Sequence, residues 1–254
     1  MARKKCLVLR CPLPPDPWGG RALLTGLFFT GTDTGVGKTL IVAAVARRLL
    51  RQGRMVRVCK PVATGATKMN GRWVSEDTLR LARAANVTDN LDGVTPWAFP
   101  EPVAPSVAAE LAGMNLNLEC LAEAVRAQQR PGSMMLVEGV GGLLCPLTER
   151  ETVADLVGLL GLPLVVVTRR GLGTLNHTLL TLEAARRRGL PVAGIVVNET
   201  MPSHGLADET NVRELQRRIE VPLLAVVPYQ EAPVSEEVPA LAAVDWWQLA
   251  SGGC

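Results

Sequence analysis

Short, almost entirely apolar segments alternate with longer amphipathic ones along most of the chain. Such short apolar runs are typical of parallel strands that are buried on both faces of a sheet. Six of them are predicted to be strands: 27–30, 56–59, 134–137, 164–168, 193–197 and 223–227. Between them, apolar residues recur at helical spacing and predict helices at 39–51, 76–85, 119–130, 153–160, 174–188 and 212–219.

This alternation predicts an α/β fold, a single domain with a doubly wound, mostly parallel sheet. Gly53, Gly161 and Gly189 stand where helix C-termini favour glycine, which supports the predicted helix ends. We expect the domain to span residues 25–250. Residues 1–24 are rich in proline and are expected to be a poorly ordered N-terminal extension. The proline-bearing stretch 92–118 is expected to be an irregular loop, of the kind that often carries function.

The composition is that of an ordinary globular protein, with 48% hydrophobic and 20% charged residues. A net charge of +3 is too small to indicate nucleic-acid binding. No apolar run approaches the roughly 20 residues that a membrane span needs. The six cysteines are dispersed and form no Cys-x-x-Cys pair, which favours a reducing compartment. We therefore expect a cytoplasmic protein with no nucleic-acid or membrane partner.

Residues 31–39 read GTDTGVGKT and lie between a predicted strand and a predicted helix. This is the context of a phosphate-binding P-loop, in which backbone N–H groups and a helix N-terminus bind phosphate. Lys38 would reach the β- and γ-phosphates, and the Thr39 hydroxyl would hold Mg²⁺. The spacing departs from the usual pattern, because Thr32 stands where the first glycine belongs. The segment still predicts a P-loop NTPase architecture that binds a nucleoside triphosphate.

Polar residues follow the predicted strands at their carboxyl ends, where open α/β sheets bind ligands. Lys60 is either a surface lysine that leaves its strand or a second positive charge beside the γ-phosphate. Thr64, shortly after it, could donate a hydrogen bond to a substrate. Glu138 ends the third strand, and a glutamate buried there would need a metal ion or a cation. Asn198 and residues 228–230 follow the fifth and sixth strands.

The residues alone do not decide the roles of several further positions. Asp77 is either an acid that favours the first turn of a helix or a further ligand of Mg²⁺. Segment 173–176 begins a helix whose free N–H groups suit a phosphate or a carboxylate. His177 is either a structural hydrogen-bonding residue or a catalytic one. The two arginines at 169–170 are either an anion contact or a surface pair.

Five segments taken together resemble the dethiobiotin synthetase family of P-loop NTPases: GTDTGVGKT (31–39), KPVATG (60–65), EGVGG (138–142), LGTLNH (172–177) and GIVVN (194–198). They are spread in order over about residues 26–230. The resemblance implies that 7,8-diaminopelargonate, CO₂ and Mg²⁺-bound ATP react to give dethiobiotin, ADP and phosphate. The intermediates would be a carbamate and a carbamic–phosphoric anhydride. It also implies a homodimer with the substrate site near the interface.

The resemblance also implies roles for individual residues. The catalytic lysines would be Lys60 and Lys38, and the Mg²⁺ ligands Thr39, Asp77 and Glu138. The ATP-binding residues would be Thr34, Gly35, Val36, Gly37, Lys38, Thr39, Leu40, Asp77, Glu138, Asn198, Pro228, Tyr229 and Gln230. The substrate would contact Thr64 and, across the interface, Gly173, Thr174, Leu175 and Asn176. Gly35 departs from some relatives, which carry an acidic residue at this position.

Two alternatives compete with this interpretation. A P-loop switch ATPase of the partitioning or cell-division type carries a signature lysine early in the P-loop, and Asp33 stands at that position here. A switch of this type would also leave Lys60 and the LGTLNH segment unexplained. A cobyrinate-type amidotransferase needs an added glutaminase domain with a nucleophilic cysteine and a histidine, for which we expect no room.

Overall fold

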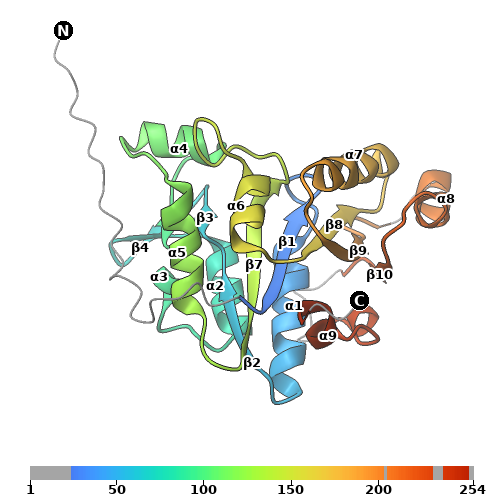
Figure 1. Cartoon of the computed structure of the whole chain (residues 1–254), viewed down its shortest axis with the longest axis horizontal. Helices are drawn as coiled ribbons and strands as arrows, with labels where there is room; N and C mark the ends of the chain where they lie inside the picture. Colours follow the sequence, from blue (N-terminus) through green and yellow to red (C-terminus); the bar gives the residue numbers. More distant parts are fainter. Residues whose placement is uncertain (1–23, 203–204, 231–236, 252–254) are drawn as a thin grey trace, which may run out of the picture.

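A six-stranded parallel sheet forms the centre of the molecule (Figure 1). In the computed structural model, which describes residues 24–202, 205–230 and 237–251, the strand order is β10-β9-β8-β1-β7-β2. These strands are β1 (Gly26–Gly31), β2 (Met55–Cys59), β7 (Ser133–Gly142), β8 (Leu164–Arg169), β9 (Val192–Asn198) and β10 (Leu223–Val227). All of their pairings are parallel, which confirms the predicted α/β fold. The extension expected at 1–24 lies, apart from its last residue, outside the described residues.

The principal helices match their predicted ranges closely, with one exception. They are α1 (Lys38–Arg51), α2 (Glu76–Ala84), α5 (Leu118–Gln128), α6 (Val153–Leu160), α7 (Thr174–Arg187) and α8 (Leu206–Gln216). The prediction for the last helix, 212–219, was wrong, because the helix begins at Leu206 and ends at Gln216. Its first residue, Leu206, is exposed, and only later residues such as Leu215 pack against the sheet. The apolar residues that pack at helical spacing therefore start several residues after the helix begins.

The prediction of an irregular loop at 92–118 was also wrong in part. This stretch contains α3 (Leu91–Val94), β6 (Trp97–Ala98) and α4 (Pro105–Leu111). Pro105 occupies the first turn of α4, where its missing N–H costs nothing. β6 pairs with β3 (Val62–Ala63), which follows β2. These elements are too short to produce a periodic pattern in the sequence.

Several small elements and one strand end were not predicted. A hairpin joins β4 (Thr67–Met69) to β5 (Arg72–Val74) through Asn70 and Gly71, both with positive φ, and Asn-Gly is a strong hairpin signal. The C-terminal part forms η1 (Pro239–Leu241) and α9 (Trp246–Ala250). β7 continues to Gly142, so Glu138 does not end this strand as predicted, although the pairing of β7 with β2 stops at Val137.

Helices cover both faces of the sheet (Figure 1). Phe29 and the strand residues on its face pack against α1, α2 and α9. Phe28, on the opposite face, packs in a cluster with α4, α5 and α6, and α7 and α8 extend this layer over β8 and β9. Parallel strands bring their carboxyl ends to one edge, where the predicted site residues gather. No helix in the described parts of the chain is long and apolar enough to cross a membrane.

Candidate nucleotide-binding and catalytic site

The P-loop joins β1 to α1 and presents a helix N-terminus. Gly37 precedes the first helical residue with a φ of 92°, a left-handed conformation that favours glycine. A Cβ atom at this position would lie 2.1 Å from Asn198 Nδ2, so the close approach also requires glycine. No side chain of the described residues caps α1. The first N–H groups of α1 can therefore bind an anion, as the motif predicts.

The Lys38 ammonium group folds back into this loop. The side chain is buried, and Nζ donates to the carbonyl oxygens of Gly141 at 2.7 Å and Asp33 at 3.1 Å. Burial lowers the pKa of Lys38; Glu138 acts in the opposite direction, and the charge of Lys60 adds to the lowering. The ammonium group thus lies within the loop in which a P-loop lysine meets phosphate.

Lys60 is buried between two carboxylates. Only 5% of the residue is exposed, and Nζ donates to Glu138 Oε1 at 2.8 Å and to the carboxylate of Asp77. Burial alone would lower the pKa of Lys60, but the charges and hydrogen bonds of Glu138 and Asp77 outweigh it and raise the pKa. The interpretation of Lys60 as a surface lysine is therefore wrong. This side chain is a cation held inside the site.

Of the two interpretations of Asp77, the structure bears out an acid in the first turn of a helix, and its role as a Mg²⁺ ligand stays a prediction. It lies in the first turn of α2, where Ser75 caps the helix by accepting from the Thr78 N–H at 3.1 Å. Its carboxylate nevertheless turns toward Lys60 and Thr39. Burial would raise the pKa of Asp77, but the charge and hydrogen bond of Lys60 hold it below its usual range. Asp77 is therefore an ionised carboxylate at the site.

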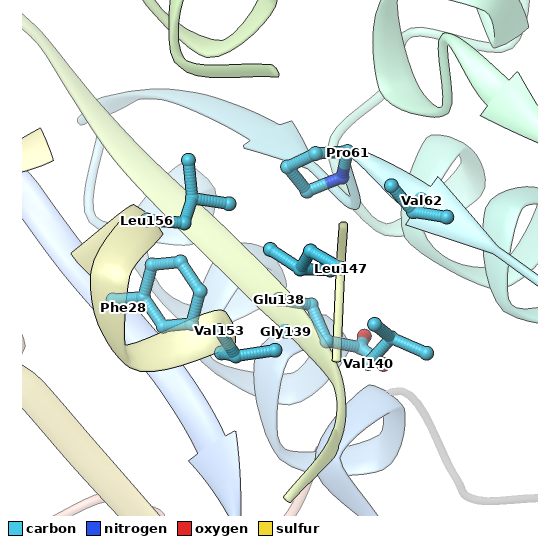
Figure 2. Close-up of a pocket in the computed structure, with 9 residues that line it drawn as sticks. All are labelled: Phe28, Pro61, Val62, Glu138, Gly139, Val140, Leu147, Val153 and Leu156. Atoms are coloured by element: carbon cyan, nitrogen blue, oxygen red, sulfur yellow. The ribbon is translucent and has the colours of Figure 1, made fainter. Parts of the chain in front are cut away.

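The two carboxylate oxygens of Glu138 differ. Oε1 accepts from Thr39 Oγ1 and from Lys60 Nζ, both at 2.8 Å. Oε2 is buried and has no hydrogen-bond partner among the described residues. The pocket beside Glu138 is lined mainly by apolar side chains, such as Leu147 and Val153 (Figure 2). A buried carboxylate oxygen without a partner is costly, so Oε2 indicates a place for a cation.

The donors around Oε2 fit Mg²⁺. The Thr39 hydroxyl gives its proton to Glu138, which leaves its lone pairs for a metal ion. Mg²⁺ is usually bound through one or two carboxylates together with phosphate oxygens and water, and Glu138 and Asp77 supply such carboxylates. Within the described residues, no group of three or more His, Cys, Asp and Glu side chains could hold a metal ion. These donors suit an ion that arrives with a nucleotide.

Asn198, the last residue of β9, contacts the P-loop. It is buried, and its Nδ2 donates to the carbonyl oxygen of Val36 at 3.0 Å. Because a carbonyl oxygen can only accept, this bond orients the amide and leaves Oδ1 as an acceptor. Oδ1 has no partner in the described part of the chain. Nearby, the Tyr229 N–H donates to Glu199 Oε2 at 3.1 Å, which ties segment 228–230 to the end of β9.

Comparisons with known proteins identify the family. A family profile described as an AAA domain matches residues 25–237. The ATP-dependent dethiobiotin synthetase BioD of Anaeromyxobacter dehalogenans is 42% identical over 221 residues, which cover 87% of this chain and 97% of that protein. This chain belongs to the ATP-dependent dethiobiotin synthetase family. The protein of the same name from Thermodesulfovibrio yellowstonii is 38% identical over 212 residues, which cover 80% of this chain and 88% of the relative.

Solved structures give a weaker likeness. A ParA family ATPase from Chlorobium tepidum aligns over 89% of this chain and 98% of its own, with 16% identity and a TM-score of 0.49. The identity of 38–42% to dethiobiotin synthetases does not favour the switch ATPase that the P-loop alone left open.

In this member of the dethiobiotin synthetase family, α7 begins beside a second pocket. Gly173 precedes the helix with a φ of 90°, and no side chain of the described residues caps it. The pocket has a volume of about 270 Å³ and is lined by Thr32, Cys145, His177 and Leu180 among others. His177 is half-buried in its wall. The predicted substrate residues Thr64 and Asn176 are not hydrogen-bonded to the cluster around Glu138 within the described residues, and their role stays a prediction.

The sequence did not predict the contacts that join these parts of the synthetase site. Thr168 Oγ1, fully buried, lies 3.1 Å from the Thr32 hydroxyl, 2.8 Å from that of Thr174 and 2.9 Å from that of Thr178. This network links the P-loop to the start of α7. Arg170, whose role was open, forms an ion pair with Glu199. The sequence offered only two signals for these contacts: Thr168 ends an apolar run, and the acidic Glu199 follows Asn198. Neither signal is a motif.

Proposed function

We propose that this protein makes dethiobiotin from 7,8-diaminopelargonate and CO₂, with ATP and Mg²⁺, in the cytoplasm. The observation that carries the proposal is the buried group of Lys38, Lys60 and Glu138 beside the uncapped start of α1. Such a group suits phosphoryl transfer, in which the protein contributes positioning and charge stabilisation. Membership of the family supports the choice of substrates, since relatives with the synthetase name are 38% and 42% identical.

The reaction implied by the family has three steps. One substrate amine attacks CO₂ and loses a proton, which gives a carbamate. A carbamate oxygen then attacks the γ-phosphorus of ATP, and ADP leaves. The second amine attacks the carbonyl carbon of the resulting anhydride and loses a proton. The ring closes as a cyclic urea, and phosphate leaves with the carbamate oxygen that attacked it.

The two lysines would stabilise the negative charge that spreads over the γ-phosphate during transfer. Lys38 would exchange its carbonyl partners in the loop for phosphate oxygens. Lys60 would supply a second positive charge from its position just after β2. Because its carboxylate partners raise the pKa of Lys60, we assign it electrostatic stabilisation and not proton abstraction.

Thr39, Asp77 and Glu138 would hold Mg²⁺. When bound, the ion neutralises negative charge on the β- and γ-phosphates. Two observations support this assignment: Glu138 Oε2 has no partner among the described residues, and the Thr39 hydroxyl is oriented by Glu138.

The base would lie against Asn198 and residues 228–230. Asn198 Oδ1 is a buried acceptor, which favours a base with an exocyclic amino group, such as adenine. A base with a carbonyl oxygen at the same place would put two acceptors together. This argument supports ATP over GTP.

The substrate carboxylate would bind at the start of α7, beside the second pocket. Residues 173–176 form a helix N-terminus there that no side chain of the described residues caps. Leu172, Leu180 and Leu144 expose apolar side chains in this region. Exposed apolar patches often mark protein–protein contacts, and they support a homodimer with the substrate site near its interface. Sedimentation of the wild type and of Leu180→Glu tests this: a wild-type monomer at micromolar concentration would contradict it.

The proposed function is tested by supplying the diamine, bicarbonate, Mg²⁺ and ATP. We expect dethiobiotin and phosphate in equal amounts, each dependent on the diamine. Folded protein that makes no dethiobiotin would overturn the proposal. ATP hydrolysis that needs no diamine but responds to a protein partner would favour the switch ATPase instead.

A further inference from the structure

Arg170 lies where three neighbouring strands of the sheet end. It follows β8 directly, and β9 and β10 are the next strands in the sheet. Its backbone N–H donates to the carbonyl oxygen of Asn198 at 2.9 Å. Its guanidinium group forms an ion pair with Glu199, and Nε donates to the carbonyl oxygen of Asp208 in α8 at 2.6 Å. One side chain thus joins the ends of β8 and β9 to the first turn of α8.

Glu199 extends these contacts to β10. Its backbone N–H donates to the carbonyl oxygen of Val227 at 2.9 Å, and its Oε2 accepts from the Tyr229 N–H at 3.1 Å. The carboxylate therefore has one oxygen on Arg170 and the other on the backbone of segment 228–230. This segment lies next to Asn198 in the sheet, because β9 and β10 pair up to Asn198 and Val227.

The burial of the pair makes it more consequential than the surface ion pairs of the chain. The side chains of Arg170 and Glu199 are 22% and 11% exposed, whereas those of Arg187 and Glu183 on α7 are 75% and 39% exposed. Removing one partner of a shielded pair leaves the other charge poorly solvated, while exposed pairs contribute little. Without Arg170, the Glu199 carboxylate would turn toward water and release the Tyr229 N–H.

We propose that Arg170 is a positioning residue for the base of the nucleotide. It holds Glu199, Glu199 holds the backbone at Tyr229, and this backbone together with Asn198 forms the wall that receives the base. Arg170 touches neither the phosphates nor the reacting atoms in this arrangement. The proposal rests on the proposed function in one respect, the assignment of Asn198 and residues 228–230 to the base.

The test compares two ligands that share the phosphate end of the site. ATP contacts both ends, whereas inorganic tripolyphosphate contacts the P-loop alone. For Arg170→Met we expect the Kd of ATP to rise about tenfold, while the Kd of tripolyphosphate and kcat at saturating ATP stay within about twofold. Arg187→Met, which removes an equal charge from an exposed pair, should change none of these values.

Three further variants keep the test decisive if Arg170→Met folds poorly. Glu199→Gln preserves the volume of the side chain but not its charge, and it should weaken ATP binding in the same way. The double variant should weaken it no more than the stronger single one, because both act through the same contact. Arg170→Lys, which can still pair with Glu199, should recover part of the affinity.

Some outcomes overturn the proposal. Equal weakening of ATP and tripolyphosphate would show that Arg170 supports the fold in general. Unchanged ATP binding, or additive effects of the two substitutions, would show that the contact does not serve the base. Wild-type protein that binds tripolyphosphate but no nucleotide would overturn the assignment of the base site and this proposal with it. Wild-type protein that binds ATP but makes no dethiobiotin would overturn the proposed reaction alone, since the binding test would still stand.

Discussion

The two ends of the site use their carboxylates differently. We call residues 31–39, Lys60, Asp77 and Glu138 the phosphate end, and Arg170, Asn198, Glu199 and residues 228–230 the base end. At the phosphate end, Lys60 bridges two carboxylates and is almost fully buried. At the base end, Glu199 reaches the backbone of Tyr229, which is itself exposed.

This difference separates two kinds of effect. The phosphate end places charges where they can act on the reacting phosphate, so substitutions there should change turnover most. The base end shapes a wall from main chain and one amide, so substitutions there should change affinity most. Gly37 and Asn198 lie where the two ends meet, so substitutions of these residues should affect both turnover and affinity.

Lys60→Gln should have the largest effect, because it removes the charge and keeps a polar side chain that can still donate a hydrogen bond. We expect kcat to fall by about 10²–10³-fold, with the Kd of ATP changed by less than about threefold. Phosphate release and nucleotide binding measure the two quantities. Lys68→Gln, at an exposed lysine, is the control and should change neither. Near-normal turnover of Lys60→Gln would show that the role of Lys60 is assigned wrongly.

Gly37→Ala should come next. The left-handed φ of 92° disfavours alanine, and the new Cβ would meet Asn198 Nδ2. With 1–3 kcal/mol of strain, we expect ATP affinity to fall by about 10- to 100-fold. Gly53→Ala is the matched control, because Gly53 has a φ of 73° but no atom within 4 Å of an added Cβ. If both variants bind ATP as the wild type does, the close approach of Gly37 and Asn198 is unimportant.

Asn198→Ala should have a smaller effect with a distinct signature. Loss of the amide removes the acceptor for the base and the donor to Val36, so ATP affinity should fall about tenfold. The preference for ATP over GTP should fall with it, as competition binding measures. Asn211→Ala is the control, since Asn211 is also buried but donates to Gly171 instead. An unchanged preference would contradict the role given to Oδ1.

Asp155→Ala should change stability and leave both ends of the site intact. Asp155 completes the capping box of α6, accepting from the Thr152 N–H at 2.7 Å, and pairs with Arg188. Burial would raise the pKa of Asp155, but the hydrogen bonds of Thr152 and the charge of Arg188 outweigh it and lower the pKa.

The sign of the pH dependence follows from this lowered pKa. The contribution of Asp155, about 1 kcal/mol, should be complete above the unfolded pKa of about 3.9 and be lost as the pH falls through the folded value. Urea unfolding at pH 7 and pH 3 measures it, with Asp92→Ala, which breaks an exposed pair with Arg72, as the control. A difference between Asp155→Ala and wild type that is equal at both pH values would contradict this account.

The sequence predicted the sheet and the position of the P-loop well for a physical reason. Buried parallel strands need apolar side chains on both faces, and a P-loop needs glycines and Lys38 in fixed order, so both leave local patterns. Short elements such as β6 and α4 leave none. The start of α8 was missed because it does not contact the core.

The base end could not be predicted in the same way. The pairing of Arg170 with Glu199 and the threonine network around Thr168 join residues that are distant in sequence. Their side chains meet only because adjacent parallel strands end at one edge of the sheet. The burial of Lys60 is of the same kind, since it depends on Asp77 and Glu138 from two other elements. Such contacts follow from the topology and not from a motif.

The most direct test of the account follows one oxygen atom. In a single turnover with the diamine, ATP, Mg²⁺ and ¹⁸O-labelled CO₂, completed before the label exchanges with water, mass spectrometry of the released phosphate reports where its oxygen came from. The account predicts a single labelled oxygen in the phosphate, because a carbamate oxygen attacks the γ-phosphorus and leaves with it. Unlabelled phosphate, formed by attack of water on ATP, would contradict it.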